Sequence, residues 1–116
     1  MRQVVQQPVG DGRPLTEPVL LILMSLANQP RHGYALIKDI EVLSGRRVRL
    51  STGTLYGALR RLLADGWIQR FEQDDTSRDK QAYRLTGEGR RQLETEIERL
   101  KQLTRAGAAR LRMKEA

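Results

Sequence analysis

The chain has 116 residues and a formal net charge of +7, from 21 Lys and Arg against 14 Asp and Glu. This length allows one modest hydrophobic core, and the positive charge favours polyanionic partners such as nucleic acid. The absence of cysteine excludes disulfides, thiolate metal sites and cysteine nucleophiles. The longest apolar run, residues 19–24, is too short to span a membrane. We therefore expect a cytoplasmic protein without a cofactor and without a place in the membrane.

The N-terminal part of the chain changes character at Thr16. Residues 1–15 contain two prolines and two glycines without an apolar period, which predicts a flexible arm. Thr16 can then cap a helix that has Pro18 in its first turn, and residues 19–27 are nearly all apolar. Such a helix must be covered on more than one side, so it should pack on its own domain and on something else.

The middle of the chain predicts two more helices around a short strand. Apolar residues at helical spacing predict a helix from about 32 to 44, which Gly45 ends. The alternation in residues 46–50 predicts a very short, half-buried strand. Ser51 or Thr52 then caps a third helix that continues to about residue 65. Its apolar face consists of Leu55, Ala58, Leu59, Leu62 and Leu63.

The last part of the chain predicts a hairpin and a long helix. Residues 67–73 and 82–85 are strand candidates, and the polar loop between them predicts an antiparallel pair. Thr86 caps a final helix whose apolar residues follow a four-and-three spacing, which is typical of a seam against another helix. Thr104 and Gly107 interrupt this seam, so we expect the last turns to fray.

This element order is that of a winged helix. The predicted fold class is mainly α with a small β-hairpin: a flexible arm over 1–15, a winged helix-turn-helix DNA-binding domain over 16–85 and a C-terminal dimerisation helix over 86–116. Three segments also occur in a characteristic order: HGYALIKDI, GTLYGALRRLLADGWI and YRLTGEGRRQL. With them, the chain resembles the PadR family of bacterial transcriptional regulators over about residues 17–100.

The resemblance implies a regulator, of the repressor type, that a small-molecule effector of unknown identity releases from DNA. It places residues 53–56 in the recognition helix and residues 83–86 between the wing and the dimer helix. Gly57 and Thr52 depart from the family pattern, which commonly has proline at both positions. Some small members bind flat aromatic compounds between tryptophans of the dimer helices, whereas the only tryptophan here is Trp67.

Candidate DNA contacts lie on the third helix, before it and on the wing. A helix fits the major groove with its N-terminal turns deepest, and affinity comes mainly from phosphate contacts. We expect the side of the third helix that faces away from its leucines to approach the bases and the adjacent backbone. These residues are Ser51, Thr52, Thr54, Tyr56 and Arg60. The expected phosphate contacts are Arg46, Arg47, Arg49, Arg78 and Lys80.

The first and last helices are predicted to form a homodimer interface, because a lone domain would expose their apolar residues. Pairing across a two-fold axis would place two recognition helices about 34 Å apart, which predicts a palindromic operator in double-stranded DNA. The expected interface residues are Val19, Leu20, Leu23, Leu93, Ile97, Leu100 and Leu103.

An alternative hypothesis is a winged-helix dimer that acts as an adaptor for protein or RNA. An enzyme is not supported, because the sequence has no phosphate-cradling loop, no metal-ligand constellation and no nucleophile with a nearby base. The only histidine, His32, is interpreted as a residue that caps and packs the second helix. Tyr34 and Trp67 are interpreted as core residues.

Overall fold

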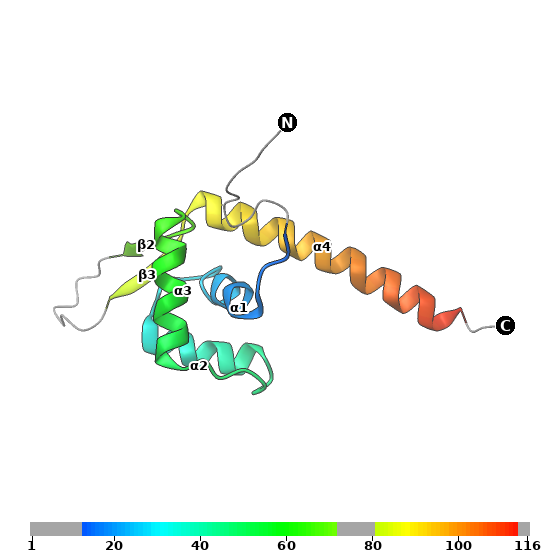
Figure 1. Cartoon of the computed structure of the whole chain (residues 1–116), viewed down its shortest axis with the longest axis horizontal. Coiled ribbons are helices and arrows are strands. Elements are labelled where there is room, and N and C mark those ends of the chain that lie inside the picture. The colour runs from blue at the N-terminus through cyan, green and yellow to red at the C-terminus, as the bar shows by residue number, and fades with distance from the viewer. Residues whose placement is uncertain (1–12, 72–80, 114–116) are drawn as a thin grey trace.

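The computed structural model describes residues 13–71 and 81–113. A small sheet lies at one side of the helices, and the last helix extends away from the rest of the molecule (Figure 1). Within the described ranges, no helix is long and apolar enough to cross a membrane. In chain order the elements are α1 (Glu17–Ser25), β1 (Arg31–His32), α2 (Gly33–Leu43), α3 (Thr52–Ala64), β2 (Ile68–Phe71), β3 (Ala82–Leu85) and α4 (Gly87–Arg112).

Three helices begin at the hydroxyl residues that the sequence predicts. Thr16 and Ser51 each accept a hydrogen bond from the backbone N–H three residues later, at 3.4 and 3.1 Å. Thr86 accepts the equivalent bond at 3.0 Å. Each cap satisfies a donor that has no acceptor within its helix. The predicted starts of α1, α3 and α4 are therefore confirmed.

The sheet is antiparallel and has the strand order β1-β3-β2. β2 and β3 form the predicted hairpin. β1 is not predicted, because two residues show no alternation and pair only with a strand about fifty positions later. The strand predicted at residues 46–50 is wrong: Gly45 and Arg46 turn the chain with φ values of +64° and +68°, and β3 already has a partner on each side.

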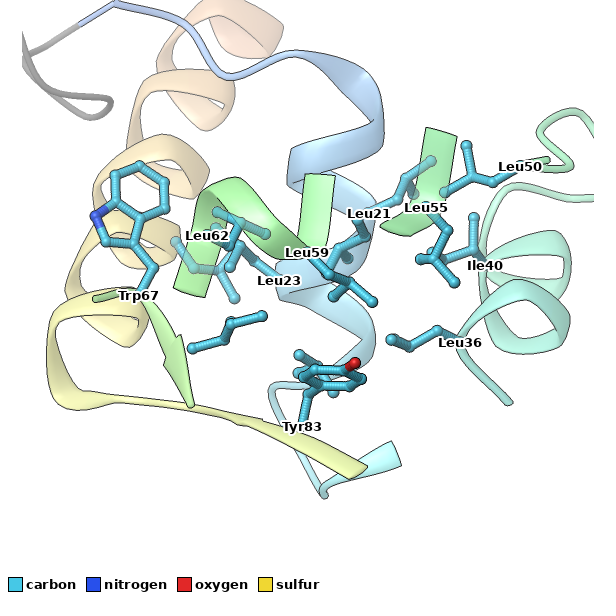
Figure 2. Close-up of a cluster of buried hydrophobic side chains, with 14 residues drawn as sticks. Leu21, Leu23, Leu36, Ile40, Leu50, Leu55, Leu59, Leu62, Trp67 and Tyr83 are labelled. Atoms are coloured by element: carbon cyan, nitrogen blue, oxygen red, sulfur yellow. The ribbon is translucent and has the colours of Figure 1, made fainter. Parts of the chain in front are cut away.

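The core lies where α1, α2 and α3 meet the sheet, and Figure 2 shows its side chains converging from these elements. Trp67 is 3% exposed, which confirms its predicted core position. Tyr34 is 70% exposed at the start of α2, so its predicted core position is wrong. The most deeply buried apolar side chains are Ile22, Leu23, Leu26, Leu36, Ile40, Leu55, Leu59, Leu62 and Ile68.

α4 is one continuous helix that outruns the core. It continues to Arg112, so the predicted fraying after Thr104 is wrong. The Thr104 hydroxyl donates to the Leu100 carbonyl at 2.7 Å and so finds a partner within the helix. Residues 101–112 are almost all exposed and project beyond the other elements (Figure 1). The second half of α4 therefore has little of its own chain to pack on.

The last residues of the predicted arm are tied to α4. Residues 1–12 lie outside the described ranges, but Leu15 packs at the edge of the core, and its N–H donates to Glu96 Oε2 at 3.3 Å. Glu96 is 5% exposed and accepts two hydrogen bonds from the Arg99 guanidinium, at 3.0 and 2.6 Å. The Arg99 bonds and the smaller effect of the Leu15 N–H lower the pKa of the Glu96 carboxyl, although its burial opposes them. This part of the arm thus belongs to the folded structure.

Candidate nucleic-acid interface

The start of α3 presents a positive helix end that has no acidic residue in its own first turn. The Ser51 carbonyl accepts the N–H of Leu55 at 2.9 Å, and the Ser51 hydroxyl accepts that of Thr54. The N–H groups of Thr52 and Gly53 are left at the open end of the helix. Because no acidic side chain lies in the first turn, the helix dipole keeps its partial positive charge there. This end of α3 is suited to an anionic group such as a phosphate.

The hydroxyl residues predicted on α3 differ in what they can offer a partner. Ser51, Thr52 and Thr54 are all exposed. The Ser51 hydroxyl donates to Thr54 Oγ1 at 3.1 Å, so these two groups bond to each other as part of the cap. Thr52 and the exposed Arg60 make no side-chain bond with any residue that the structure describes. They are the most available of the predicted contacts on α3.

Tyr56 joins α3 to α2. Its ring lies over Gly33, the first residue of α2, where an added Cβ would stand 2.8 Å from Tyr56 Cζ. The pKa of the Tyr83 hydroxyl is raised, mainly by burial and further by Tyr56, while Arg70 lowers it. Since 41% of Tyr56 is exposed, the ring both packs on α2 and reaches the surface. Tyr56 therefore fixes the position of α3 as well as facing outward.

The loop before α3 carries three exposed arginines. Arg46, Arg47 and Arg49 form no salt bridge with residues 13–71 or 81–113. Arg46 also adopts the left-handed region, which costs a non-glycine residue about 1–2 kcal/mol. The three charges remain available to phosphates beside the positive end of α3. The other predicted phosphate contacts, Arg78 and Lys80, lie outside the described residues.

Two exposed arginines that the sequence analysis missed lie on opposite faces of the hairpin, because Arg70 pairs with Tyr83 and Arg84 pairs with Gln69. Arg70 on β2 donates to Gln81 at 2.9 Å. Arg84 on β3 donates to Gln69 at 3.1 Å and lies 4.7 Å from the centroid of the Phe71 ring. Strand alternation was the available signal for Arg84, because it follows the buried Tyr83 and therefore faces the other side of the sheet.

The exposed start of α2 is a second surface that was missed. The Lys38 ammonium lies 5.6 Å from the centroid of the Tyr34 ring. Both residues are exposed, and this turn of α2 adjoins α3 through the contact between Gly33 and Tyr56. The sequence contained a signal for this surface. Lys38 follows Tyr34 by four positions, and residues at this spacing lie on the same side of a helix.

The residues predicted for the dimer interface divide into three groups by their exposure. Leu23 and Leu93 are 0% and 5% exposed in the core of their own chain, so they are not surface residues and their prediction as interface residues is wrong. Neighbouring elements of the same chain already cover both side chains. Ile97 and Leu103 are 38% and 56% exposed. The remaining predicted residues are half-buried: Val19, Leu20 and Leu100.

An apolar groove lies between α1 and α4. It has a volume of about 380 Å³, and Leu20, Met24, Ile97 and Leu100 form most of its lining. Lys101 and two other polar residues of α4 complete it. The groove thus joins the half-buried and the exposed members of the predicted interface.

His32 has a structural place without a ligand set. It is the N-cap residue of α2, as predicted, although its side chain makes no capping hydrogen bond. Its Nδ1 is buried and has no hydrogen-bond partner among the described residues. In the same ranges, no three His, Cys, Asp or Glu side chains are grouped so that they could hold a metal ion.

Comparison with known proteins identifies the family. A model of the transcriptional regulator PadR-like family matches residues 22–95. The chain belongs to this family. It is therefore a PadR-like transcriptional regulator. It is also similar to the uncharacterized 37.1 kDa protein in transposon TN4556 of Streptomyces fradiae, with 40% identity over 85 residues. The match covers 73% of this chain but only 23% of that protein's length.

Solved structures of regulators share the PadR-like winged-helix fold. A PadR family regulator from Clostridium difficile R20291 has a TM-score of 0.70 at 24% identity, over 83% of this chain and 99% of that one. One from Eggerthella lenta DSM 2243 has a TM-score of 0.62 at 31% identity, over 84% and 82%. Bacillus subtilis PadR in complex with operator DNA has a TM-score of 0.63 at 22% identity, over 72% and 48%.

Proposed function

We propose that this PadR-like regulator acts in the cytoplasm as a homodimeric repressor that binds a palindromic operator through α3. The observation that carries the proposal is the first turn of α3, which has no acidic residue and directly follows three arginines that form no ion pair with the described residues. Helix N-terminal turns enter the major groove, and arginines neutralise phosphates. The complex of Bacillus subtilis PadR with operator DNA, which has the same fold, supports DNA as the partner.

In this proposal, few side chains contact the bases, and many contact the phosphates of the DNA backbone. Arg60 can bind guanine, and the methyl group of Thr52 can contact thymine. Tyr56 packs over Gly33 and so orients α3. The exposed part of its ring is a further contact to the DNA. The phosphate contacts come from both sides of α3 and consist of Arg46, Arg47, Arg49, Arg70 and Arg84.

The charges of α4 favour an antiparallel pair of these helices. Residues 87–99 contain four glutamates and three arginines, whereas residues 100–112 contain four basic residues and no acid. Antiparallel pairing places the acidic half of one helix on the basic half of its partner. Parallel pairing would place two basic halves together, which is unfavourable.

Side-chain sizes along α4 agree with the same arrangement. With the two-fold axis at Gln102, Ile97 faces the partner's Gly107 and Leu100 faces the partner's Thr104. Large residues then lie opposite small ones, which suits close helix packing. The side chains of the partner's α4 would enter the groove between α1 and α4.

Protection mapping of the DNA upstream of the gene tests the proposal. We expect one protected region that contains two inverted half-sites, with centres about 10 base pairs or a multiple of this apart. Transcription from that promoter should fall when the protein is added. Protection of a single asymmetric site would contradict the dimer geometry. A rise in transcription would contradict repression, and preferential binding to RNA of the same sequence would favour the adaptor hypothesis.

A further inference from the structure

The end of α3 is connected to the start of α4 through Trp67. The Trp67 N–H donates to the Leu62 carbonyl, in the last turn of α3, at 3.0 Å. The Trp67 carbonyl accepts the N–H of Thr86, the N-cap residue of α4, at 3.0 Å. A single buried residue is therefore bonded both to the helix that we propose reads DNA and to the helix that we propose forms the dimer.

Thr86 strengthens this connection through its side chain. The Thr86 hydroxyl donates to the Gly66 carbonyl at 2.6 Å and accepts the Gly89 N–H at 3.0 Å. Gly66 in turn donates its N–H to the Leu63 carbonyl of α3 at 3.1 Å. The last turn of α3 and the first turn of α4 are thus both bonded to the same two residues, Gly66 and Trp67.

Gly89 allows α4 to contact this connection directly. A Cβ added at Gly89 would collide with the Trp67 carbonyl oxygen and would lie 2.9 Å from the carbonyl carbon. Both are backbone atoms, so a change of rotamer cannot relieve the collision. The Leu85 side chain lies 3.2 Å from the same point. Any side chain at position 89 would therefore displace the start of α4.

Arg90 holds α4 against a different element. Its guanidinium donates to the Ala27 carbonyl, just after the end of α1, at 3.1 Å. The start of α4 is therefore fixed on two sides, which opposes rotation of the helix about Trp67. We call Gly66, Trp67, Thr86, Gly89 and Arg90 the joint.

The direction in which α4 leaves the joint matters because the helix is long. The proposed two-fold axis at Gln102 lies thirteen residues after Gly89, which is about 20 Å along the helix at about 1.5 Å per residue. A tilt of about 10° at the joint would displace Gln102 by about 3.5 Å, close to the rise of one base pair, about 3.4 Å. A small change at Gly89 would therefore alter the position of a half-site by one step of the DNA.

We propose that the joint sets the distance between the two α3 helices of the dimer, and that Gly89 is the positioning residue that determines which half-site spacing the regulator accepts. This spacing role rests on the proposed function, because it requires a dimer on two half-sites. The contact between Gly89 and Trp67 does not depend on it.

The affinity of the full-length protein for a series of operator fragments tests the proposal. The fragments carry the two half-sites of the protected promoter region, with their centres moved apart or together in steps of one base pair. The unmodified protein should prefer one spacing over its neighbours by at least about tenfold. Gly89→Ala should shift this preference to another spacing or reduce it at least about fivefold. Its affinity for a fragment with a single half-site should stay within about twofold, because α3 itself is unchanged.

Gly87→Ala is the matched control in the same turn of α4. A Cβ added there lies 3.9 Å from Arg91 Nη1, which is an ordinary contact, so the preferred spacing should not change. Fluorescence measures the joint without DNA, because Trp67 is the only tryptophan of the chain and is 3% exposed. Quenching by acrylamide should increase in Gly89→Ala and stay unchanged in Gly87→Ala.

A second pair of variants tests the joint even if Gly89→Ala does not fold. Thr86→Val removes the hydroxyl that bonds to Gly66, so the preference for one spacing should weaken. Thr86→Ser keeps this hydroxyl and should retain the preference.

The outcomes separate the joint from the proposed function. If Gly89→Ala weakens binding to all fragments by the same factor and keeps the preferred spacing, its role is structural only and the proposal is overturned. An equal change of spacing in Gly87→Ala, or equal behaviour of Thr86→Val and Thr86→Ser, would also overturn it. An unmodified protein that binds every spacing equally would refute the proposed dimer on paired half-sites and the spacing role with it. Increased quenching in Gly89→Ala would then still establish the contact between Gly89 and Trp67.

Discussion

At the scale of single residues, Gly33 and Tyr56 fix how α3 stands against α2. The tyrosine occupies the space that a side chain on Gly33 would need. A DNA-reading helix must be held accurately, because small displacements of its first turns move every contact that they make. The sequence suggested Tyr56 as a base contact, whereas the structure gives it a positioning role that depends on a glycine twenty-three residues earlier.

Gly33→Ala tests this contact. The new Cβ would collide with the Tyr56 hydroxyl, so the ring must move, and overpacking of this kind costs about 1–3 kcal/mol. Urea denaturation should show the loss, and preference for the promoter fragment should fall with it. Gly53→Ala is the control, because an added Cβ there meets no atom within 4 Å. Equal unfolding free energies for the two variants would contradict the positioning role.

Arg47→Ala tests the phosphate contacts before α3. The side chain is exposed and has no ion pair within the described ranges, so its loss should leave the fold intact. Affinity for all DNA sequences should fall alike, and the slope of log K against log salt should flatten by about one. Anisotropy titrations at several salt concentrations measure this. An unchanged slope would remove Arg47 from the interface.

At the scale of elements, local signals predicted the helices well and the packing partners poorly. Capping residues and helical spacing are local, so the starts of α1, α3 and α4 could be placed from the sequence. β1 could not be, because a two-residue strand exists only through its pairing with β3. The predicted interface positions of Leu23 and Leu93 were wrong for a related reason. An apolar residue in a sequence does not indicate whether its own chain or a partner covers its side chain.

The hydrogen bonds of Glu96 predict that the attachment of the segment before α1 to α4 depends on pH. Because the folded-state pKa lies below the ordinary 4.5, the carboxylate stabilises the fold above about pH 4.5 and loses this effect as the pH falls through the lowered pKa. Glu96→Gln should therefore cost about 1–2 kcal/mol at pH 7 and almost nothing in strong acid.

Urea denaturation of the Glu96→Gln variant at several pH values measures this cost. Glu94→Gln serves as the control, because that residue is exposed and forms no ion pair with the described residues. A cost for Glu96→Gln that stays constant down to pH 3 would contradict the assignment.

Charge reversal tests the antiparallel pairing of α4. A variant with Arg105→Glu and Arg110→Glu should form a weaker homodimer, because residues 100–112 then lose the net positive charge that attracts the acidic half of the partner helix. It should prefer a partner that carries Glu94→Lys and Glu98→Lys by at least about tenfold, because several ion pairs re-form across the interface. Light scattering and mixing of labelled proteins measure both effects. A chain that carries all four substitutions should regain the homodimer in the antiparallel arrangement, whereas in a parallel pair each charge would still face its own copy and the homodimer would stay weak.

At the scale of the whole molecule, the packing of the single chain leaves part of its surface uncovered. α1, α2, α3 and the sheet share one core, whereas residues 101–112 of α4 and the groove beside α1 lack a cover from the described chain. In the proposed homodimer, a two-fold partner would supply that cover and would also set the distance between two α3 helices. Stability of the dimer and spacing on DNA would then depend on the same helix.

Competition between DNA fragments tests the central claim most directly. In physiological salt, a fragment from the gene's own promoter should outcompete random DNA of equal length by at least about a thousandfold. This preference should persist when the salt is raised, while all affinities fall together. Equal competition by the two DNAs would contradict the claim that this PadR-like regulator reads an operator through α3.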